Sequence, residues 1–439
     1  MIDLPDLSAR EWTERAERVI PGGVNSGRRR IDPPLVAQRG EGAYLVEVDG
    51  TRVIDFYGGA GTAILGHNPL AVSRAVTRAL TEGPILSGAG VTPREVQLAE
   101  TITRFVPSVE QVLFCNSGSE ATAMALRLAR AVTGRQCIVK VSGHYHGNHD
   151  AVLFNTGAPR NPDGTPTPES CGLLDAHAST TLVSDFNDLG HLETLLATRG
   201  DEIAAVIMEP IAHNGGPTLL PDSGYLAAVR SLCTRYGALL IFDEVVTLFR
   251  HAMGGVQGIF GVAPDLTTAG KALANGLPIG MVGGRSELMA RWTTSSGGDT
   301  MYGGTYNGNS ASVAAALATL GVLASGEEHA RITGLGEAMR DGLTEIAAEE
   351  GVAATATGFR SVFTLWFGGG PFRSRTDALR GDEHLFRAYR QELRARGVFE
   401  KPDRDGARSV ISAAHTRHDI DFALEMAREA LRAAKESRV

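Results

Sequence analysis

Short apolar runs rich in β-branched residues alternate in the middle of this chain with longer segments of helical period. Strand and helix in alternation need crossover connections, which favour a mostly parallel sheet covered by helices on both faces. We therefore predict an α/β fold. The runs are Val112–Phe114, Ile138–Val141, Ala205–Met208 and Ala238–Phe242, and the helical segments include Glu120–Val132 and Gly224–Tyr236.

The two ends of the chain have a different pattern. Asp49-Gly50, between the apolar runs Ala43–Val48 and Arg52–Phe56, is a strong signal for a β-hairpin. After about Gly308 long helices dominate, and we predict a smaller α+β domain formed by the N- and C-terminal segments. The helices are expected at His329–Glu350, Glu383–Arg396 and His418–Lys435, with a strand-like run at Ser361–Phe367 and a long loop at Thr156–Ser179. The predicted parts are an N-terminal segment with the hairpin (1–62), a large domain (63–310) and a small C-terminal domain (311–439).

Composition excludes several classes of protein. Hydrophobic residues make up 43% and charged residues 21% of the 439, which is typical of a globular protein and not of a disordered one. The net charge is −8 and the longest basic run is Arg28-Arg29-Arg30, so we expect no nucleic-acid partner. Small molecules are the expected partners.

The cysteines and the N-terminal residues indicate the cellular compartment that we expect for this protein. Cys115, Cys137, Cys171 and Cys233 match neither a CxxC zinc site nor a dense disulfide framework, so we expect reduced thiols. The first residues are acidic and amphipathic, unlike a secretory leader, and no uncharged apolar run reaches the ~18 residues that span a membrane. We expect a cytoplasmic protein without a membrane partner.

Four groups of residues follow predicted strands, where an α/β sheet binds its ligands. The first is Asn116–Ala121, in which two hydroxyls and unpaired N–H groups at the start of a helix could hold a phosphate. An ordinary serine N-cap would give the same pattern. The second is Asp243-Glu244, where burial of two carboxylates requires that at least one meets a cation or a metal, unless the strand end is solvated.

The third group is Lys271, in an apolar and glycine-rich setting. Burial lowers the pKa of a lysine and makes it a nucleophile or an imine former, whereas most single lysines lie on the surface. The fourth is His144–His149, with three histidines in six residues. No helical His-x3-His face or nearby cysteine pair supports a zinc site, so we expect no metal; Tyr145 can instead stack on a planar cofactor.

Together these groups predict a pyridoxal phosphate site. A phosphate cradle, an aromatic ring, a carboxylate for the pyridine nitrogen and a lysine for the aldehyde are the parts that this cofactor needs. The order of the motifs along the chain resembles that of the class III aminotransferases, in particular their glutamate-1-semialdehyde 2,1-aminomutase branch. The likeness rests on Pro21–Ser26, Ile64–His67, Asn116–Ala121, Tyr145–Gly147, Asp243–Val245, Lys271 and Ala414–Thr416.

The resemblance implies a fold-type I homodimer with active sites shared between the subunits. It implies that Lys271 holds the cofactor as an imine, that Asp243 pairs with the pyridine nitrogen, and that Tyr145 stacks on the ring. Ser117, Gly118 and Ser119 would bind the phosphate, together with Thr305 from the neighbouring subunit. The same resemblance assigns His146, Glu209, Asn214 and Val245 to the cofactor site, with Glu209 and Asn214 near the 3-oxygen, and places Arg29 at the substrate carboxylate. Which of Arg28, Arg29 and Arg30 faces the substrate stays open.

Two departures from the mutase pattern bear on the reaction. Gly59-Ala60-Gly61 stands where the branch usually has a tryptophan, and Gly406–Val410 lacks the acidic residue of the branch, with Ala407 in its place. Both changes affect the substrate pocket. We therefore expect a transaminase that acts on small amino and keto substrates, one of which carries a carboxylate. The alternatives are the intramolecular aminomutase and a non-catalytic or nucleotide-binding protein of the same architecture.

Overall fold

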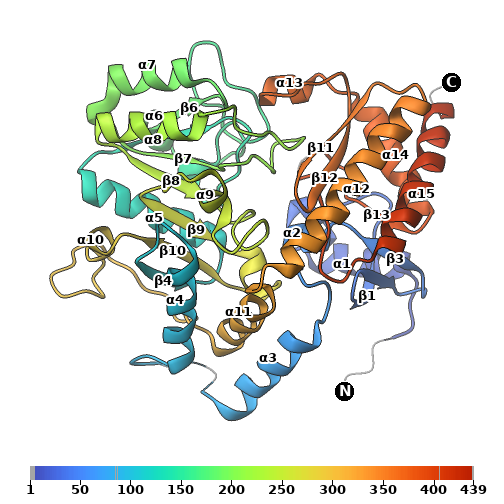
Figure 1. Cartoon of the computed structure of the whole chain (residues 1–439), viewed down its shortest axis with the longest axis horizontal. Helices are drawn as coiled ribbons and strands as arrows, with labels where there is room; N and C mark the ends of the chain where they lie inside the picture. The colour runs from blue at the N-terminus through green and yellow to red at the C-terminus, as the bar shows by residue number, and fades with distance from the viewer. Residues whose placement is uncertain (1–4, 85, 87, 405, 438–439) are drawn as a thin grey trace.

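The computed structural model describes residues 5–84, 86, 88–404 and 406–437. Figure 1 shows two parts side by side, one built around a large sheet and the other around the helices near the C-terminus. The first residues of the described chain lie with the second part, so both ends of the chain contribute to it.

The large sheet has seven strands in the order β4-β10-β9-β8-β7-β5-β6. The pairs β9-β8, β8-β7, β7-β5 and β5-β6 are parallel, and β10 runs antiparallel to both of its neighbours. The prediction of a mostly parallel sheet is thus confirmed. The strands are β4 (Gln111–Cys115), β5 (Cys137–Val141), β6 (Thr181–Ser184), β7 (Ile203–Met208), β8 (Leu239–Asp243), β9 (Leu266–Ala269) and β10 (Gly280–Gly284).

Helices cover both faces of this sheet, as the alternating pattern predicts. Helix α5 (Gly118–Thr133) belongs to one apolar cluster with residues of β7, β8 and β10. Helices α7 (Leu189–Arg199) and α8 (Tyr225–Tyr236) belong to a second cluster with the alternate residues of β5, β7 and β8. Since successive side chains of a strand point to opposite faces, strands covered on both sides must be apolar throughout. All six residues of β7 are buried.

The second part combines the two ends of the chain. Strands β2 (Tyr44–Glu47) and β3 (Arg52–Asp55) form the predicted hairpin, and β13 (Val398–Phe399) adds to β3 in parallel. This sheet has the order β1-β2-β3-β13, where β1 is Ala37–Glu41. The smaller α+β domain from both termini is therefore confirmed, while its boundaries at 62 and 310 stay predictions. Its other elements are β11 (Ala354–Phe359), β12 (Val362–Phe367), β14 (Ser409–Val410), α12 (Glu327–Glu349), α14 (Glu383–Ala395) and α15 (Arg417–Glu436).

The segment predicted as one long loop, Thr156–Ser179, is not irregular to its end. Its last residues begin helix α6 (Asp175–Thr180). The irregular part is held by Glu169, whose carboxylate accepts the N–H of Thr156 at 2.6 Å and that of Gly157 at 2.8 Å. Here a side-chain carboxylate, and not a neighbouring strand, accepts the two backbone N–H groups.

Two of the helices, α11 (Ser310–Leu323) and α12, together have the length and composition of a membrane span. No single helix of the described chain is long and apolar enough to cross a membrane; α11 and α12 pass that test only together, with a bend of 75° between them. Most of α11 is buried against other helices of the fold. The others are α1 (Ala9–Val19), α2 (Gly58–Gly61), α3 (Leu70–Glu82), α4 (Pro93–Phe105), α9 (Gly255–Phe260), α10 (Ser286–Met289) and α13 (Arg375–Leu379), with 3-10 turns η1 (Pro21–Gly23), η2 (Gly27–Arg29), η3 (Asp150–Val152), η4 (Gly200–Glu202) and η5 (Lys271–Ala274).

Candidate active site

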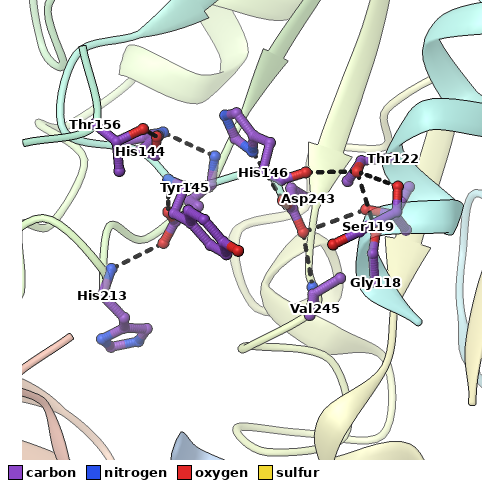
Figure 2. Close-up of polar contacts among 12 residues, drawn as sticks. Gly118, Ser119, Thr122, His144, Tyr145, His146, Thr156, His213, Asp243 and Val245 are labelled. Atoms are coloured by element: carbon purple, nitrogen blue, oxygen red, sulfur yellow. Dashed lines mark hydrogen bonds and ion pairs between the residues drawn. The ribbon is translucent and has the colours of Figure 1, made fainter. Parts of the chain in front are cut away.

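A cavity of about 210 Å³ lies at the carboxyl ends of the parallel strands. The residues that follow β4, β5, β7, β8 and β9 converge on it, as the Asp243, Tyr145 and Ser119 side chains in Figure 2 illustrate. Ligands of open α/β sheets bind at this edge. The lining residues are Gly118, Ser119, Tyr145, His146, Gly147, Glu209, Asn214, Asp243, Val245, Val246 and Lys271.

The N-terminus of α5 forms one wall of this cavity. Ser117 is the N-cap, and its hydroxyl accepts the N–H of Glu120 at 3.2 Å, so the ordinary cap is present. Ser117 itself does not line the cavity, whereas Gly118 and Ser119 do. The first N–H groups of a helix have no partner within the helix and attract anions. The cap and the anion cradle therefore coexist, with Ser117 as the cap and the next two residues facing the cavity.

Two glycines allow the chain to pass closely around this helix end. A Cβ atom on Gly147 would lie 2.7 Å from the Ser119 hydroxyl oxygen, and one on Gly118 would lie 3.0 Å from the methyl groups of Val245. The close approach lets Asn148 donate its N–H to the Ser119 hydroxyl at 2.9 Å. A larger residue at position 147 would push the Tyr145–Gly147 segment away from α5.

Asp243 is the carboxylate at the end of β8. His146 Nδ1 lies 2.8 Å from its Oδ2, Val245 donates its N–H to Oδ1, and the Thr268 hydroxyl lies 3.3 Å from Oδ1 (Figure 2). Both Asp243 and His146 are buried. The expected cationic partner for one carboxylate is thus an imidazole, which carries the charge only when it is protonated.

Glu244 points away from the cavity, so of the two carboxylates only Asp243 lies near an ionisable group there. Among the described residues the Glu244 carboxylate forms no ion pair: it accepts the Val256 N–H at 2.7 Å and bonds Thr247 and Gln257. Burial raises the pKa of Glu244, and these hydrogen bonds partly oppose that rise. Hydrogen-bond donors of the described chain satisfy the second carboxylate.

The three histidines between 144 and 149 do not converge. His146 contacts Asp243, His144 Nδ1 accepts the N–H of Glu209 at 3.0 Å, and His149 Nε2 lies 3.2 Å from the Thr122 hydroxyl. Burial lowers the pKa of His144 well below its ordinary value. Within the described residues no three His, Cys, Asp or Glu side chains are arranged for a metal ion.

Glu209 and Tyr145 form the side of the cavity opposite α5. Glu209 accepts the Tyr145 N–H at 2.9 Å and the His213 N–H at 3.0 Å, so two backbone groups fix its carboxylate. The Arg28 guanidinium lies 4.0 Å from the centre of the Tyr145 ring. A cation on an aromatic face is attracted by the ring quadrupole, so Arg28 is held on the Tyr145 ring.

Lys271 lies at the junction of strand β9 and the turn η5. Its φ is +43°, a left-handed conformation that is uncommon for a residue with a side chain and that often marks functional sites. Burial and the Arg408 charge lower the pKa of Lys271 to about 7, although Asp243 and Glu209 raise it. An amine with this pKa is largely neutral, and therefore nucleophilic, slightly above neutral pH.

This pKa predicts how the apoprotein recovers its cofactor. The rate of pyridoxal phosphate attachment should rise as the pH increases through about 7 and then level off, since only the neutral amine reacts. An ordinary lysine, with a pKa near 10.4, would give a rate that still rises at pH 9. Stopped-flow absorbance of the reconstituting protein, with the ionisation of the free cofactor measured separately, distinguishes the two curves.

A second cavity of about 500 Å³ shares Tyr145, Asn214 and Lys271 with the first. Arg28 and Arg29 both line it, whereas Arg30 lines only a neighbouring cavity near α1. Ala60 also lines it, in agreement with its predicted place in the substrate pocket. The other lining residues are Ser26, Ile31, Leu35, Leu45, Asp55, Tyr57, Gly59, His67, Phe399, Lys401, Gly406 and Arg408.

Arg408 is the main residue of this pocket that the sequence did not reveal. It is buried, and it donates to Asn214 Oδ1 at 2.7 Å and to the Ala60 carbonyl at 2.6 Å. Burial lowers the pKa of Arg408. Its neighbour Ala407 is fully buried but does not line the pocket, so the loss of an acid at 407 matters less than the arginine beside it. The sequence did hold one sign of this role: Arg408 lies in Gly406–Val410, the segment that departs from the aminomutase pattern.

Thr305 lies outside both cavities of this chain. It is exposed in the turn between residues 301 and 309, which is tied to the cofactor side by a 2.9 Å hydrogen bond from Asn116 to Asn307. Its predicted place at the phosphate therefore depends on a second subunit.

A family model for class III aminotransferases matches residues 26–358. The chain belongs to the class III aminotransferase family. The family uses pyridoxal phosphate, and a transaminase with bound pyridoxal phosphate superimposes on 99% of this class III chain with a TM-score of 0.89 and 29% identity. The predicted enzyme class, cofactor and fold type are confirmed.

The proteins similar to this class III enzyme include both aminomutases and transaminases. Glutamate-1-semialdehyde 2,1-aminomutases of Caldivirga maquilingensis and Thermomicrobium roseum are 39% and 41% identical over 97% and 95% of the chain, and over 98% and 96% of their own lengths. An omega-transaminase from Sphaerobacter thermophilus is 33% identical, with a TM-score of 0.92 over 98% of both chains. A β-phenylalanine aminotransferase from Variovorax paradoxus is 32% identical, with a TM-score of 0.86 over 96% of this chain and 93% of its own.

The residues at the cavity fit pyridoxal phosphate. The helix end at Gly118 and Ser119 offers N–H groups for a phosphate, Asp243 offers a buried carboxylate, and Lys271 offers an amine of lowered pKa at the same cavity. Among the residues that line this cavity, the buried His146 leaves its Nε2 without a hydrogen-bond partner in the described structure.

Proposed function

We propose that this enzyme is a transaminase that moves nitrogen between an amino donor and a carbonyl acceptor, at least one of which carries a carboxylate. The observation that carries the proposal is Arg408, a buried guanidinium beside the reactive lysine for which no ion pair is found among the described residues, although the charge of Glu209 acts on it from a distance. A buried charge is costly unless an opposite charge compensates it. A substrate carboxylate is the anion that would do so, since a guanidinium binds it in a bidentate way.

Arg29, predicted from the family resemblance, and Arg28 are proposed to add to this anion site. Both line the same pocket as Arg408, and the only carboxylate of its lining is Asp55. Asp55 is occupied: it lies 2.8 Å from His67 Nε2 and accepts the N–H groups of Tyr57 and Gly58. The excess of positive charge supports an anionic substrate in this pocket.

The cofactor supplies the aldehyde carbon that receives nitrogen and a ring that takes up electrons. We propose that Gly118 and Ser119 orient its phosphate and that Asp243, fixed by His146, holds a proton at its pyridine nitrogen. Tyr145 would cover its ring, and Glu209, Asn214 and Val245 would border it. Lys271 would hold the aldehyde and move the proton between carbon atoms as a general acid and base.

The competing function is the intramolecular aminomutase named for several relatives. A mutase must retain one diamino intermediate through both halves of its reaction, because an escaped intermediate leaves the cofactor in the wrong form. A transaminase must release one product and admit a second substrate. Ala60, small where the mutase branch has a tryptophan, supports such exchange.

Nitrogen transfer between two molecules is the decisive test. We expect nitrogen-15 from a separate amino donor in the aminated product, and little isomerisation of glutamate-1-semialdehyde. The measurement is mass spectrometry of the product, with a Lys271→Ala protein as the background control. Rapid formation of 5-aminolevulinate from the semialdehyde without a donor would establish the mutase instead.

We also propose a homodimer with shared active sites, located in the cytoplasm. The turn that carries Thr305 exposes Met301 and Tyr306, which are 69% and 64% exposed, and Val91 at the nearby start of α4 is 68% exposed. Exposed apolar side chains next to a polar residue of the site support contact with a second copy of this chain. The four cysteines form no disulfide, which is consistent with a reducing compartment.

Complementation tests the shared site. Lys271→Ala and Thr305→Ala proteins should each have low activity, and a heterodimer of the two should recover about half of the wild-type activity, because one of its sites then carries both lesions and the other carries none. Mixed dimers isolated with two affinity tags provide the sample. A fully active monomer, or verified heterodimers without recovery, would contradict the shared site.

A further inference from the structure

The walls of the substrate pocket include two segments in which alternate residues face the pocket. Phe399 and Lys401 line it and Glu400 does not; Arg408 lines it and Ser409 does not. In extended chain successive side chains point to opposite sides. Glu400 and Ser409 are both buried, and they meet behind the pocket wall, where the Ser409 hydroxyl donates to Glu400 Oε2.

Glu400 has a second partner that anchors this contact to the fold. Arg390 of α14 lies with its Nη2 2.9 Å from Glu400 Oε2, and its Nη1 donates to the Lys401 carbonyl at 2.5 Å. Both side chains of the pair are fully or almost fully buried. A buried ion pair, reinforced by the hydrogen bond from Arg390 Nη1 to the Lys401 carbonyl, holds its partners in one geometry.

The residue that precedes Ser409 in the chain is Arg408. Arg408 projects into the pocket from a chain that is fixed on one side by Ser409 and on the other by its own bonds to Asn214 and Ala60. Val410, which follows Ser409, donates its N–H to the Phe56 carbonyl at 2.6 Å. This bond joins the segment to the chain that leads to Ala60. Loss of the Ser409 hydroxyl would remove the side-chain bond from this segment to Glu400, while the pairing of Ser409 with Phe363 of β12 would remain.

We propose that Glu400 is a positioning residue for substrate recognition, which acts through Ser409 on Arg408. Glu400 touches neither pocket nor substrate. Its carboxylate fixes the direction from which the Arg408 guanidinium meets a substrate carboxylate, so it sets affinity for carboxylates without contributing to the cofactor site. This inference rests on the proposed role of Arg408 as the carboxylate site.

The test measures the binding of propionate, a carboxylate without an amino group, to the holoenzyme by calorimetry. Ser409→Ala removes only the hydroxyl and leaves the Arg390–Glu400 pair, and it should weaken propionate about tenfold, which corresponds to ~1.4 kcal/mol. Glu400→Gln should weaken propionate at least as much. The affinity for pyridoxal phosphate and its absorbance spectrum should stay unchanged in both proteins.

The matched control is Ser412→Ala, which removes another buried serine hydroxyl three residues along. That hydroxyl contacts His415 and not Glu400. The control should keep propionate affinity even if its melting temperature falls as far as that of Ser409→Ala. A merely structural role would weaken propionate and cofactor together, or affect both serine variants alike, and either result overturns the proposal.

Arg408→Ala separates this proposal from the one on which it rests. If Arg408→Ala leaves propionate affinity unchanged, the carboxylate site itself is wrong, and the role of Glu400 falls with it. If Arg408→Ala weakens propionate and Ser409→Ala does not, the carboxylate site stands and only the positioning role is wrong. Loss of affinity in Arg408→Ala, Ser409→Ala and Glu400→Gln, with cofactor binding intact, supports both.

Discussion

Replacing Lys271 by alanine is expected to reduce turnover by at least ~10³-fold, within the range that proton transfer by a positioned side chain supplies. The same change should abolish the covalent attachment of pyridoxal phosphate that borohydride makes permanent. The physical reason is that Lys271 combines a lowered pKa with a position at both cavities, so that one amine serves attachment and proton transfer. Single-turnover absorbance and intact-protein mass spectrometry measure the two effects.

Lys140 offers a matched control for this prediction. It is also buried, and burial lowers its pKa to about 7, but its amine donates to the Phe154 carbonyl and lines neither cavity. A Lys140→Met protein that folds should therefore keep the reducible attachment. If Lys271→Ala still attaches the cofactor at another lysine and turns over normally, the assignment of Lys271 is wrong.

Residues whose place follows from local pattern could be predicted from the sequence. Asp243 ends an apolar strand, and Gly118 and Ser119 begin a helix directly after another, so parallel strands bring them to one edge of the sheet. The apolar, glycine-rich setting of Lys271 made it a candidate imine former, and the family resemblance implied the same role. The same local logic gave the hairpin of β2 and β3.

Residues whose place depends on distant contacts could not be predicted. Arg408 faces the pocket because Asn214 and Ala60, both far away in the chain, accept its N–H groups. Glu244 needs no cation because the chain returns at Val256 and Gln257 to donate to it. The periodicity of the sequence predicts local helices and strands, and it does not predict which distant segments come into contact at Arg408 or at Glu244. The place of Thr305 is harder still to predict, since the phosphate that it is expected to contact lies in the site of another subunit.

Asp243→Asn is expected to reduce activity by about 10²- to 10³-fold, while the protein still folds and binds its cofactor weakly. Asparagine keeps an oxygen that can accept the Val245 N–H and the Thr268 hydroxyl proton, but it loses the charge that faces His146 and the cavity. Without this charge the proton at the pyridine nitrogen is no longer stabilised. The expected loss of rate corresponds to ~3–4 kcal/mol, since each ~1.4 kcal/mol is tenfold.

Glu244, the adjacent carboxylate, serves as a control that separates the proposed role of Asp243 at the cofactor from an effect of burying any acid. Glu244 is buried as Asp243 is, but it faces Val256 and Gln257 and lines neither cavity. Glu244→Gln should therefore lower the melting temperature and leave the absorbance of bound cofactor and the rate per folded enzyme unchanged. Asp243→Asn should do the reverse, with altered cofactor absorbance and a lost rate at a nearly constant melting temperature. Unchanged turnover in Asp243→Asn would contradict the proposed pairing with the pyridine nitrogen, and equal losses in both variants would assign the two carboxylates to stability alone.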